Sequence, residues 1–270
     1  MSSERIYTIV SWNVNGYSDD IHAWMLLNLG KIDVFFLSET KRSKEHLENK
    51  FKEFSGYKWI INAHVPAHYH GVVMLIRNNI SFNQIDACIG SECRKDSKSG
   101  NPAIGRIITV QIDKYILVGS YVPNSGVGGE PHKLEYRVSK WDPVFYGYLN
   151  KLKEKSPVIW IGDINVALTD NDVSNPKAMK NWAGFRSVEK QGLYNFLLTG
   201  WIDIWRSQHP NDKKYTWKGN KHHIENYGMR IDNILVSNNI LKIDNIKFDS
   251  FLCPEVTLSD HIPLGVRINI

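Results

Sequence analysis

Short, almost purely apolar segments are the feature of this 270-residue chain that most restricts its fold. They are rich in β-branched and aromatic residues, and several lack the alternation of apolar and polar residues that a half-solvated strand shows. Continuous apolar runs of this length are typical of strands that are covered on both faces. The predicted strands are Ile6–Trp12, Val34–Leu37, Val72–Ile76, Ile107–Ile112, Tyr115–Tyr121, Val158–Ile161, Ile231–Val236 and Leu264–Ile268.

Helical periodicity lies between these strands. Ser43–Phe54 places apolar residues at helical spacing, and a longer apolar stripe with steps of three or four covers residues 134–152. Asp142, which precedes a proline, interrupts that stripe, so we expect the helix to kink there or to restart with Asp142 as its cap. Ser187 is expected to cap a third helix that runs toward Leu198.

The mixture of strands and helices predicts an α/β fold in which two packed mixed β-sheets are flanked by helices. We find no internal repeat, no low-complexity stretch and no linker rich in Pro, Ser or Gly. A chain of this length suits one large α/β domain or two small ones. Because nothing divides the sequence, we predict a single domain over residues 1–270.

Charge, cysteine content and hydropathy limit the classes of function. The formal net charge of +5 permits a polyanionic partner without demanding one. The cysteines Cys88, Cys93 and Cys253 are odd in number and form no C-x-x-C pair, which argues against a disulfide scaffold or a four-cysteine zinc site. No apolar run approaches the ~18 to 20 residues of a membrane span, and the short polar N-terminus has no signal-peptide pattern. We therefore expect an intracellular protein with no membrane partner, and a monomer because coiled-coil heptads are absent.

Several apolar segments share one layout, in which the strand ends in a polar residue suited to metal or phosphate chemistry. The polar residues at these ends are Asn13 and Asn15, Glu39, Tyr121 and Asn124, and Asp163 and Asn165. Asp232 is embedded in another apolar strand, and Asp260 and His261 stand just before the last one. Because the strand ends of packed sheets lie side by side, we expect these side chains to converge on one point.

The converging residues would form an oxygen-rich site. Three carboxylates, those of Glu39, Asp163 and Asp260, would lie with the amide oxygens of Asn13 and Asn165. Hard oxygen ligands of this kind suit Mg²⁺, with Mn²⁺ as an alternative. A Lewis acid, an activated water and donors for the transition state are what phosphodiester hydrolysis requires.

Each of these residues also has a structural explanation. An Asn after a strand is usually a turn former, Glu39 could be a surface charge, and Asp260-His261 could be a hydrogen-bonded turn. Asp232 is more informative, because a half-buried carboxylate in an apolar strand needs a partner. His261 beside it would make an acid–base or charge-stabilising pair. The joint pattern favours a catalytic site over any of the separate structural explanations.

The ordered series SWNVNG, LSETK, YVPNSG, GDINVA, RIDNILVS and SDHIP resembles the endonuclease/exonuclease/phosphatase superfamily, and it extends from residue 10 to residue 266. The resemblance implies a four-layer α/β sandwich with its active site at one edge of the paired sheets. Two further segments, SNPKAMKNWAGF and YTWK, resemble the loop and the aromatic motif of exonuclease III-type apurinic/apyrimidinic (AP) endonucleases. The residue after YVPNSG, Val127, departs from relatives that place a basic DNA-inserting residue there, and Asn15 departs from the many that carry Asp.

The resemblance implies a role for each matching residue. The residues implied for the metal ion are Glu39, Asn13, Asn15, Asp163, Asn165 and Asp260. Those implied for catalysis are Tyr121, Asp163, Asn165, Asp232 and His261. Those implied for DNA contact are Asn124, Asn175, Lys177, Trp217, Met229 and His261. Asp163 would orient or deprotonate the attacking water, Asn165 and His261 would hold the phosphate, and Trp217 and Met229 would wall the abasic sugar.

The implied activity is metal-dependent hydrolysis of the DNA backbone 5′ to an abasic site in double-stranded DNA, with a 3′-hydroxyl product, as in base-excision repair. Exonuclease and 3′-phosphodiesterase activities could accompany it. Two alternatives stay open, a general or retroelement-like DNA endonuclease of the same superfamily and a catalytically inactive DNA-binding protein. Phosphate contacts are expected from basic residues such as Lys41, Arg106, Lys177 and Arg230.

Overall fold

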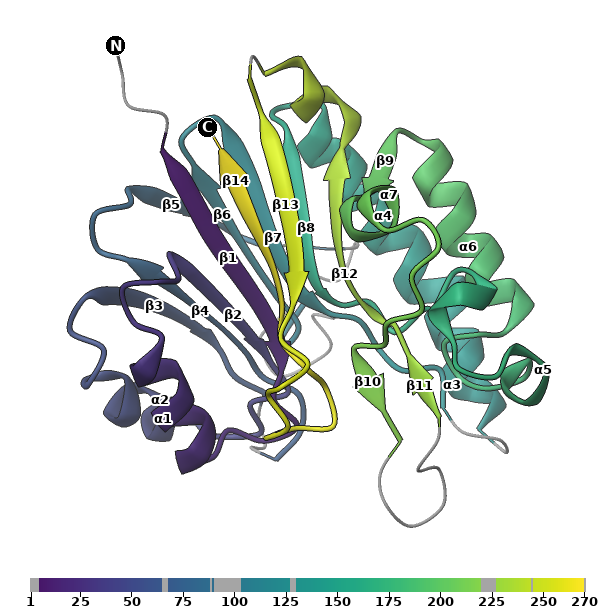
Figure 1. Ribbon diagram of the computed structural model, residues 1–270, viewed down its shortest axis with the longest axis horizontal. Coiled ribbons are helices and arrows are strands. Elements are labelled where there is room, and N and C mark those ends of the chain that lie inside the picture. The colour runs from purple at the N-terminus through teal and green to yellow at the C-terminus, as the bar shows by residue number, and fades with distance from the viewer. Residues whose placement is uncertain are drawn as a thin grey trace.

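The computed structural model describes residues 5–64, 68–87, 89, 103–126, 130–219, 227–243 and 245–269. Two six-stranded mixed sheets pack face to face in this part of the chain (Figure 1). The first sheet contains, in spatial order, β13 (Lys247–Leu252), β14 (Leu264–Asn269), β1 (Ile6–Asn13), β2 (Val34–Ser38), β4 (Val72–Arg77) and β3 (Tyr57–Asn62). The second contains β5 (Phe82–Ile85), β6 (Ile107–Ile112), β7 (Tyr115–Tyr121), β8 (Val158–Asp163), β12 (Asp232–Ser237) and β9 (Trp201–Asp203).

Helices cover the outer face of each sheet, as Figure 1 shows. The first sheet is covered by α1 (Asp19–Leu27) and α2 (Lys44–Phe51), and the second by α4 (Asp142–Lys153) and α6 (Ser187–Leu198). Shorter elements are α3 (Pro131–Tyr136), α5 (Pro176–Met179), α7 (Ile204–Gln208) and the ribbon of β10 (Trp217–Lys218) and β11 (Gly228–Met229). The expected four-layer α/β sandwich is therefore confirmed.

The central strands are apolar throughout because both of their faces are buried. In β8, Ile159 and Ile161 enter the core between the two sheets, whereas Val158 and Trp160 pack under the helices of the outer layer. The two sheets approach closely, since a Cβ atom added at Gly119 of β7 would lie 2.2 Å from the Phe36 ring of the opposite sheet. Close packing of the sheets fixes the relative position of their strand ends, and it is at these ends that the polar residues lie.

The expected cap at Ser187 is wrong, and of the two alternatives for Asp142, a kink or a helix cap, the structure excludes the cap. A π-helical turn, Arg137–Trp141, leads directly into α4, so Asp142 lies inside a continuous helical segment. Its carboxylate accepts a 2.6 Å hydrogen bond from the buried Arg137 guanidinium, and a buried arginine needs such a partner. Ser187 is the first residue of α6 rather than its cap, because Arg186 holds the cap position.

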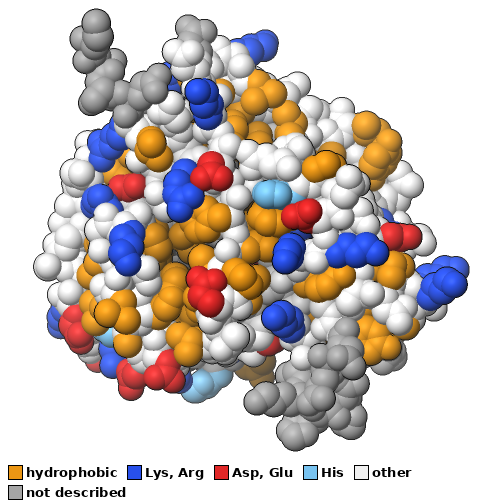
Figure 2. All heavy atoms as spheres, in the orientation of Figure 1, with side chains coloured by type: hydrophobic (Ala, Val, Ile, Leu, Met, Phe, Trp, Pro, Cys, Tyr) orange, Lys and Arg blue, Asp and Glu red, His pale blue; other side chains and the backbone are white. Residues whose placement is uncertain are grey.

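The surface carries charges of both signs. Figure 2 shows Lys and Arg side chains scattered over one face with Asp and Glu among them. Cys253 is a free, partly exposed cysteine, and Cys88 and Cys93 lie outside the described residues. No helix within the described ranges is both long and apolar enough to cross a bilayer.

Candidate active site

The polar strand ends meet at one edge of the paired sheets, as the sequence predicts. Asn13 ends β1, and Asp163 ends β8 in the opposite sheet. Asp232 begins β12 directly beside Asp163, because these two residues are register partners in antiparallel strands. Tyr121 flanks Asp163 on its other side, as its partner in the parallel pair β7–β8.

The side-chain amide of Asn13 joins the two sheets. Its Nδ2 donates to Glu39 Oε1 and to Asp163 Oδ2, at 2.9 Å in both cases, while its Oδ1 accepts from the Asn15 backbone N–H at 3.0 Å. An amide nitrogen has no free lone pair for a metal ion, so in this orientation the Asn13 nitrogen positions the two carboxylates, and only its amide oxygen could contact a cation. The assignment of Asn13 to the metal-ligand set stays a prediction.

Left-handed backbone turns aim several of these side chains inward. Asn15, Glu39 and Asn165 have φ angles of 44°, 52° and 53°, a region that non-glycine residues seldom occupy and that clusters at functional sites. Gly162, with φ 136°, precedes Asp163, and a Cβ atom there would lie 2.0 Å from the Ser120 carbonyl oxygen. The glycine of the GDIN motif thus lets β8 deliver the Asp163 carboxylate beside β7.

His261 and Asp232 form a buried pair. His261 Nδ1 lies 2.7 Å from Asp232 Oδ2, and both side chains are almost fully enclosed. Burial lowers the pKa of the imidazole, but the Asp232 carboxylate more than offsets this and raises it to about 10. His261 is therefore a cation at neutral pH, with its free ring nitrogen available for a negatively charged group.

Asp163 lies in the most carboxylate-rich part of the site. Its oxygens accept from the Asn13 amide and from the Asn165 backbone N–H, each at 2.9 Å. Burial raises its pKa to about 8, and the neighbouring carboxylates of Asp232 and Glu39 act in the same direction. A carboxylate whose pKa lies near neutrality is suited to accept a proton from water.

On the Glu39 side of the site, the ammonium group of Lys41 lies between two side-chain oxygen atoms. Lys41 Nζ lies 2.7 Å from Glu39 Oε2 and 2.5 Å from Asn15 Oδ1. Burial raises the pKa of Glu39, but hydrogen bonds from Lys41 and Asn13 outweigh it and leave that pKa below its usual value. This oxygen pair fits a hard divalent cation. Asp163, Asp232 and His261 could also hold a metal ion, since one ligand atom from each lies within 4.8 Å of the others.

The ring of Tyr121 is contacted by two basic side chains, those of Arg106 and His70. The Arg106 guanidinium lies 4.9 Å from the centroid of its ring, and the His70 ring lies at 5.6 Å. Burial, together with the nearby charges of Glu39 and Asp163, raises the pKa of the phenol well above its ordinary value. The hydroxyl of Tyr121 therefore keeps its proton and can donate a hydrogen bond.

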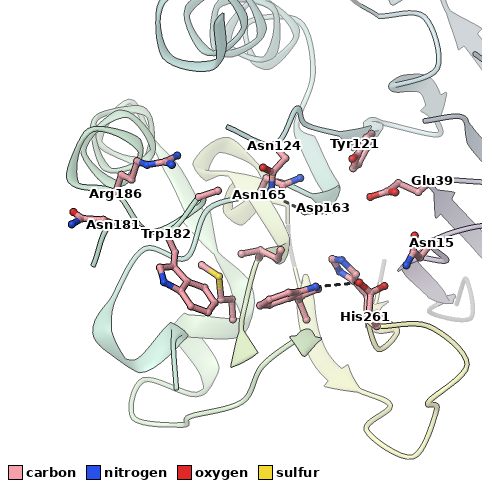
Figure 3. Close-up of a pocket in the computed structure, with 15 residues that line it drawn as sticks. Asn15, Glu39, Tyr121, Asn124, Asp163, Asn165, Asn181, Trp182, Arg186 and His261 are labelled. Carbon is pink, nitrogen blue, oxygen red and sulfur yellow. Dashed lines mark hydrogen bonds between the residues drawn. The ribbon is translucent and has the colours of Figure 1, made fainter. Parts of the chain in front are cut away.

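A pocket of about 580 Å³ opens from these groups (Figure 3). Its polar end holds Asn15, Glu39, Tyr121, Asp163, Asn165, Asp260 and His261, and Asn124 joins it by donating to Asn165 Oδ1 at 3.0 Å. Its other end is apolar and includes Trp217 and Met229, as the sequence predicts. The Trp217 indole N–H donates to Asp260 Oδ2 at 3.2 Å and so ties the apolar wall to the polar end. The pocket is also lined by five residues that the sequence motifs do not predict: Asn181, Trp182, Ala183, Arg186 and Ile231.

A sequence signal for part of this missed set existed. Asn181, Trp182 and Ala183 belong to the segment SNPKAMKNWAGF, which was assigned to DNA contact through Asn175 and Lys177 alone. Trp182 is the largest side chain of this segment, and such a large apolar group needs something to pack against.

Three residues expected at DNA lie away from the pocket. Asn175 and Lys177 are exposed on α5, where Asn175 Oδ1 caps the helix by accepting from the Ala178 N–H at 3.1 Å. Arg230 is buried, with its guanidinium 2.6 Å from Asp172 and 2.7 Å from Asp203. The expectation that Arg230 contacts phosphate is therefore wrong, because this arginine neutralises buried carboxylates. Val127 lies outside the described residues.

A second cavity of about 470 Å³ lies behind Tyr121 and contains two cationic side chains, Arg106 and Lys133, of which Lys133 is paired with Glu130 at 2.6 Å. It is lined by His70, Arg106, Tyr121, Pro123, Asn124, His132, Lys133 and Tyr136. Arg106 makes hydrogen bonds to His70 Nε2 at 2.9 Å and to the Tyr121 carbonyl at 3.3 Å, and among the described residues it has no carboxylate ion pair. Burial lowers the pKa of Arg106, so its charge is poorly solvated and would be stabilised by an anion.

Fold and site together define a hydrolase for phosphate esters with the four-layer sandwich architecture. The chain belongs to the endonuclease/exonuclease/phosphatase family, whose profile matches residues 10–261. It is 35% identical over 275 residues to a DNA-(apurinic or apyrimidinic site) endonuclease of Dictyostelium discoideum, an alignment that covers 99% of this chain and 72% of the relative. It is 31% identical over 268 residues to an exodeoxyribonuclease of Bacillus subtilis, with 97% and 99% covered. The crystal structure of an AP endonuclease from Leishmania major superposes with a TM-score of 0.83 at 25% identity, covering 98% of this chain and 88% of that one.

Proposed function

We propose that this protein is a divalent-metal-dependent AP endonuclease that hydrolyses the DNA phosphodiester 5′ to an abasic site in base-excision repair. One observation carries the proposal. The amide of Asn13 holds the Glu39 and Asp163 carboxylates together across the two sheets, beside the buried His261–Asp232 pair and at the mouth of a largely apolar pocket. A deoxyribose without a base is apolar enough to enter that pocket and costs less to flip out of the helix than a paired nucleotide.

Different residues of the site perform the separate steps of the hydrolysis. The imidazolium of His261 and the amide of Asn165 bind the scissile phosphate, and Asp232 fixes the ring of His261. Asp163 accepts a proton from the attacking water as the new P–O bond forms. The P–O3′ bond breaks and the 3′-oxygen leaves with a proton, for which the protonated phenol of Tyr121, a residue that lines the pocket, is the donor. The products are a 3′-hydroxyl and a 5′-deoxyribose phosphate.

We assign the metal ion to the Glu39 side of the site. Glu39 with Asn15 and Asp260 would hold Mg²⁺ or Mn²⁺, because these side chains offer only oxygen ligands and Lys41 already places a positive charge between two of them. When bound, the metal supplies a Lewis acid for the phosphate oxygens. Asp163 and Asn165 then serve the water and the phosphate.

Positive groups beside the pocket would hold the DNA backbone. The cavity behind Tyr121 presents Arg106 and Lys133, and a phosphate next to the scissile one could enter it. Asn124 lies between the two cavities and lines both of them. Asn175 and Lys177, exposed on α5, are further candidates for contacts with double-stranded DNA. We expect the protein to act as a monomer.

The deciding experiment uses a labelled duplex that carries one tetrahydrofuran abasic analogue, beside the same duplex undamaged, each with Mg²⁺ and with EDTA. We expect a single metal-dependent nick 5′ to the analogue and none in the intact duplex. Asp163→Asn should abolish the nick, and Tyr194→Ala, a change of an exposed side chain on α6, should not. Equal cutting of both duplexes would indicate a general nuclease, and no cutting with either Mg²⁺ or Mn²⁺ would refute the proposal.

A second activity is favoured by the relatives. The match to an exodeoxyribonuclease over 97% of this chain makes removal of 3′-terminal nucleotides a candidate companion activity. The same test duplex, prepared with a recessed and labelled 3′ end, would reveal it as a ladder of shortened products.

A further inference from the structure

The apolar end of the pocket contains two indole rings, those of Trp182 and Trp217. Trp182 and Trp217 both pack on the small apolar cluster that contains Met229 and Ile231, and all four residues line the pocket. Trp182 is braced from behind by Tyr227, whose ring centroid lies 5.0 Å from its own. The wall is therefore a supported aromatic surface, and Trp182 is only partly buried within it.

The position of Trp182 separates it from the reacting groups. Figure 3 shows Trp182, Asn181 and Arg186 on the side of the pocket opposite Glu39 and Asn15. Trp217 lies nearer to the polar end, since its indole N–H is bonded to Asp260. A sugar seated against Trp217 and Met229 would thus leave Trp182 uncovered, with space in front of it.

The size of the pocket agrees with a larger ligand. Its volume of about 580 Å³ falls inside the range of roughly 300 to 1,000 Å³ that is usual for pockets holding drug-sized molecules. A deoxyribose phosphate fills only part of such a space. A nucleobase attached to that sugar would have a flat aromatic partner in Trp182 and polar groups nearby in Asn181 and Arg186.

Arg186 is held in place for such a contact. Its guanidinium donates to Ser125 Oγ at 2.6 Å and to the Gly126 carbonyl at 2.9 Å, so it is fixed at the rim of the pocket. Its side chain is 19% exposed. A fixed, partly exposed guanidinium can bind the oxygen or ring-nitrogen acceptors of a base edge without a large loss of side-chain entropy.

We infer that stacking of the terminal base on Trp182 sets how well this pocket cuts base-bearing 3′ ends relative to abasic ones. The inference rests on the proposed function. Removal of a 3′-terminal nucleotide breaks the same P–O3′ bond by the same attack of water, releasing a nucleoside 5′-monophosphate and leaving a 3′-hydroxyl. The terminal nucleotide would occupy the place of the abasic residue, with its base at Trp182.

The test compares two duplexes that differ only at a recessed 3′ terminus, which ends either in deoxyadenosine or in the tetrahydrofuran analogue. The ratio of kcat/KM for the two termini is measured for the wild-type protein and for Trp182→Ala, Trp182→Phe and Tyr194→Ala. Equilibrium binding of both duplexes in EDTA, followed by fluorescence anisotropy, gives a readout that does not need catalysis.

We expect Trp182→Ala to lower the ratio of base-bearing to abasic cleavage by about 5- to 150-fold, the range that stacking of one base on an aromatic side chain provides. Trp182→Phe should restore most of the ratio, the binding preference should change in parallel, and Tyr194→Ala should leave both unchanged. An unchanged ratio in Trp182→Ala, an equal loss on both termini, or a wild-type protein that neither binds nor removes the deoxyadenosine terminus better than background would overturn the inference. If neither terminus is cut but the binding preference depends on Trp182, the proposed function fails and the base-binding pocket stands.

Discussion

Replacement of Asp163 by Asn should make the protein more stable and at the same time inactive. Asp163 is 2% exposed and shares its surroundings with Asp232 and Glu39, and burial with this repulsion raises its pKa from 3.8 to about 8. A carboxyl group whose pKa is raised by folding stabilises the folded state below its unfolded pKa and loses that contribution as pH rises toward the folded value. The loss for Asp163 thus develops between about pH 4 and pH 8.

The magnitude follows from the size of the shift. Between pH 4 and pH 7, about three pH units, the carboxyl group is ionised in the unfolded state but still protonated in the folded state. This difference lowers the free energy of unfolding by about 4 kcal/mol at pH 7. Asn at position 163 cannot accept from both the Asn13 amide and the Asn165 N–H, and one buried donor without an acceptor costs about 1 to 3 kcal/mol. The net gain at pH 7 is therefore about 1 to 3 kcal/mol, or about 2 to 10 °C in Tm for a chain of this size.

Thermal unfolding by calorimetry in EDTA, at half-unit steps from pH 4.5 to pH 8.5, measures this effect. The Tm difference between Asp163→Asn and wild type should grow with pH and vanish or reverse at pH 4.5. Asp170→Asn, a change of an exposed aspartate beyond the end of β8, should show no such trend. The rate of incision by Asp163→Asn should fall by about 10²- to 10⁴-fold, the usual contribution of a general base. A Tm that falls by the same amount at every pH would refute the argument from carboxylate repulsion.

Other predictions concern pH, metal and DNA. The value of kcat/KM should rise with pH as Asp163 loses its proton, with a midpoint at or below pH 8 because a bound cation lowers the pKa of Asp163. It should fall again near pH 10 as His261 loses its charge, and His261→Gln should remove this fall. Glu39→Gln should raise the half-saturating Mg²⁺ concentration by at least about tenfold and weaken Mn²⁺ binding measured by electron paramagnetic resonance; unchanged Mn²⁺ binding would move the metal to the group formed by Asp163, Asp232 and His261. Arg106→Gln should reduce the slope of log K against log salt for duplex binding by about 1, whereas Lys242→Gln, beyond the far end of β12, should leave it unchanged in fluorescence anisotropy.

The central strands of this fold could be predicted because each of them is a continuous apolar run in the sequence. Ile107–Ile112 and Tyr115–Tyr121 have the predicted bounds, since continuous burial on two faces demands continuous apolar sequence. Shorter or more polar strands, such as β5 and β13, escaped detection because edge strands are partly exposed and tolerate polar residues. The single-domain prediction for residues 1–270 stays a prediction.

The polar and charged residues of the site could be predicted from the sequence for a similar reason. Asn13 and Asp163 end strands, Asp232 begins one, and Glu39 directly follows β2. Polar residues at several strand ends of packed sheets meet at one edge. The structural roles of Asp142 and Arg230 could not be predicted from the sequence, because each side chain is held by an oppositely charged partner that folding brings close.

The sequence by itself determined the architecture and the inventory of the reactive groups. Only the tertiary structure decided how these groups face one another: that the Asn13 nitrogen points at two carboxylates, that Lys41 lies between the oxygens of Glu39 and Asn15, and that Trp182 enters the pocket. The physical reason is that apolar burial and strand periodicity are properties of neighbouring residues, whereas the orientation of an amide or the charge of a buried carboxylate depends on atoms that are distant in sequence and adjacent in space.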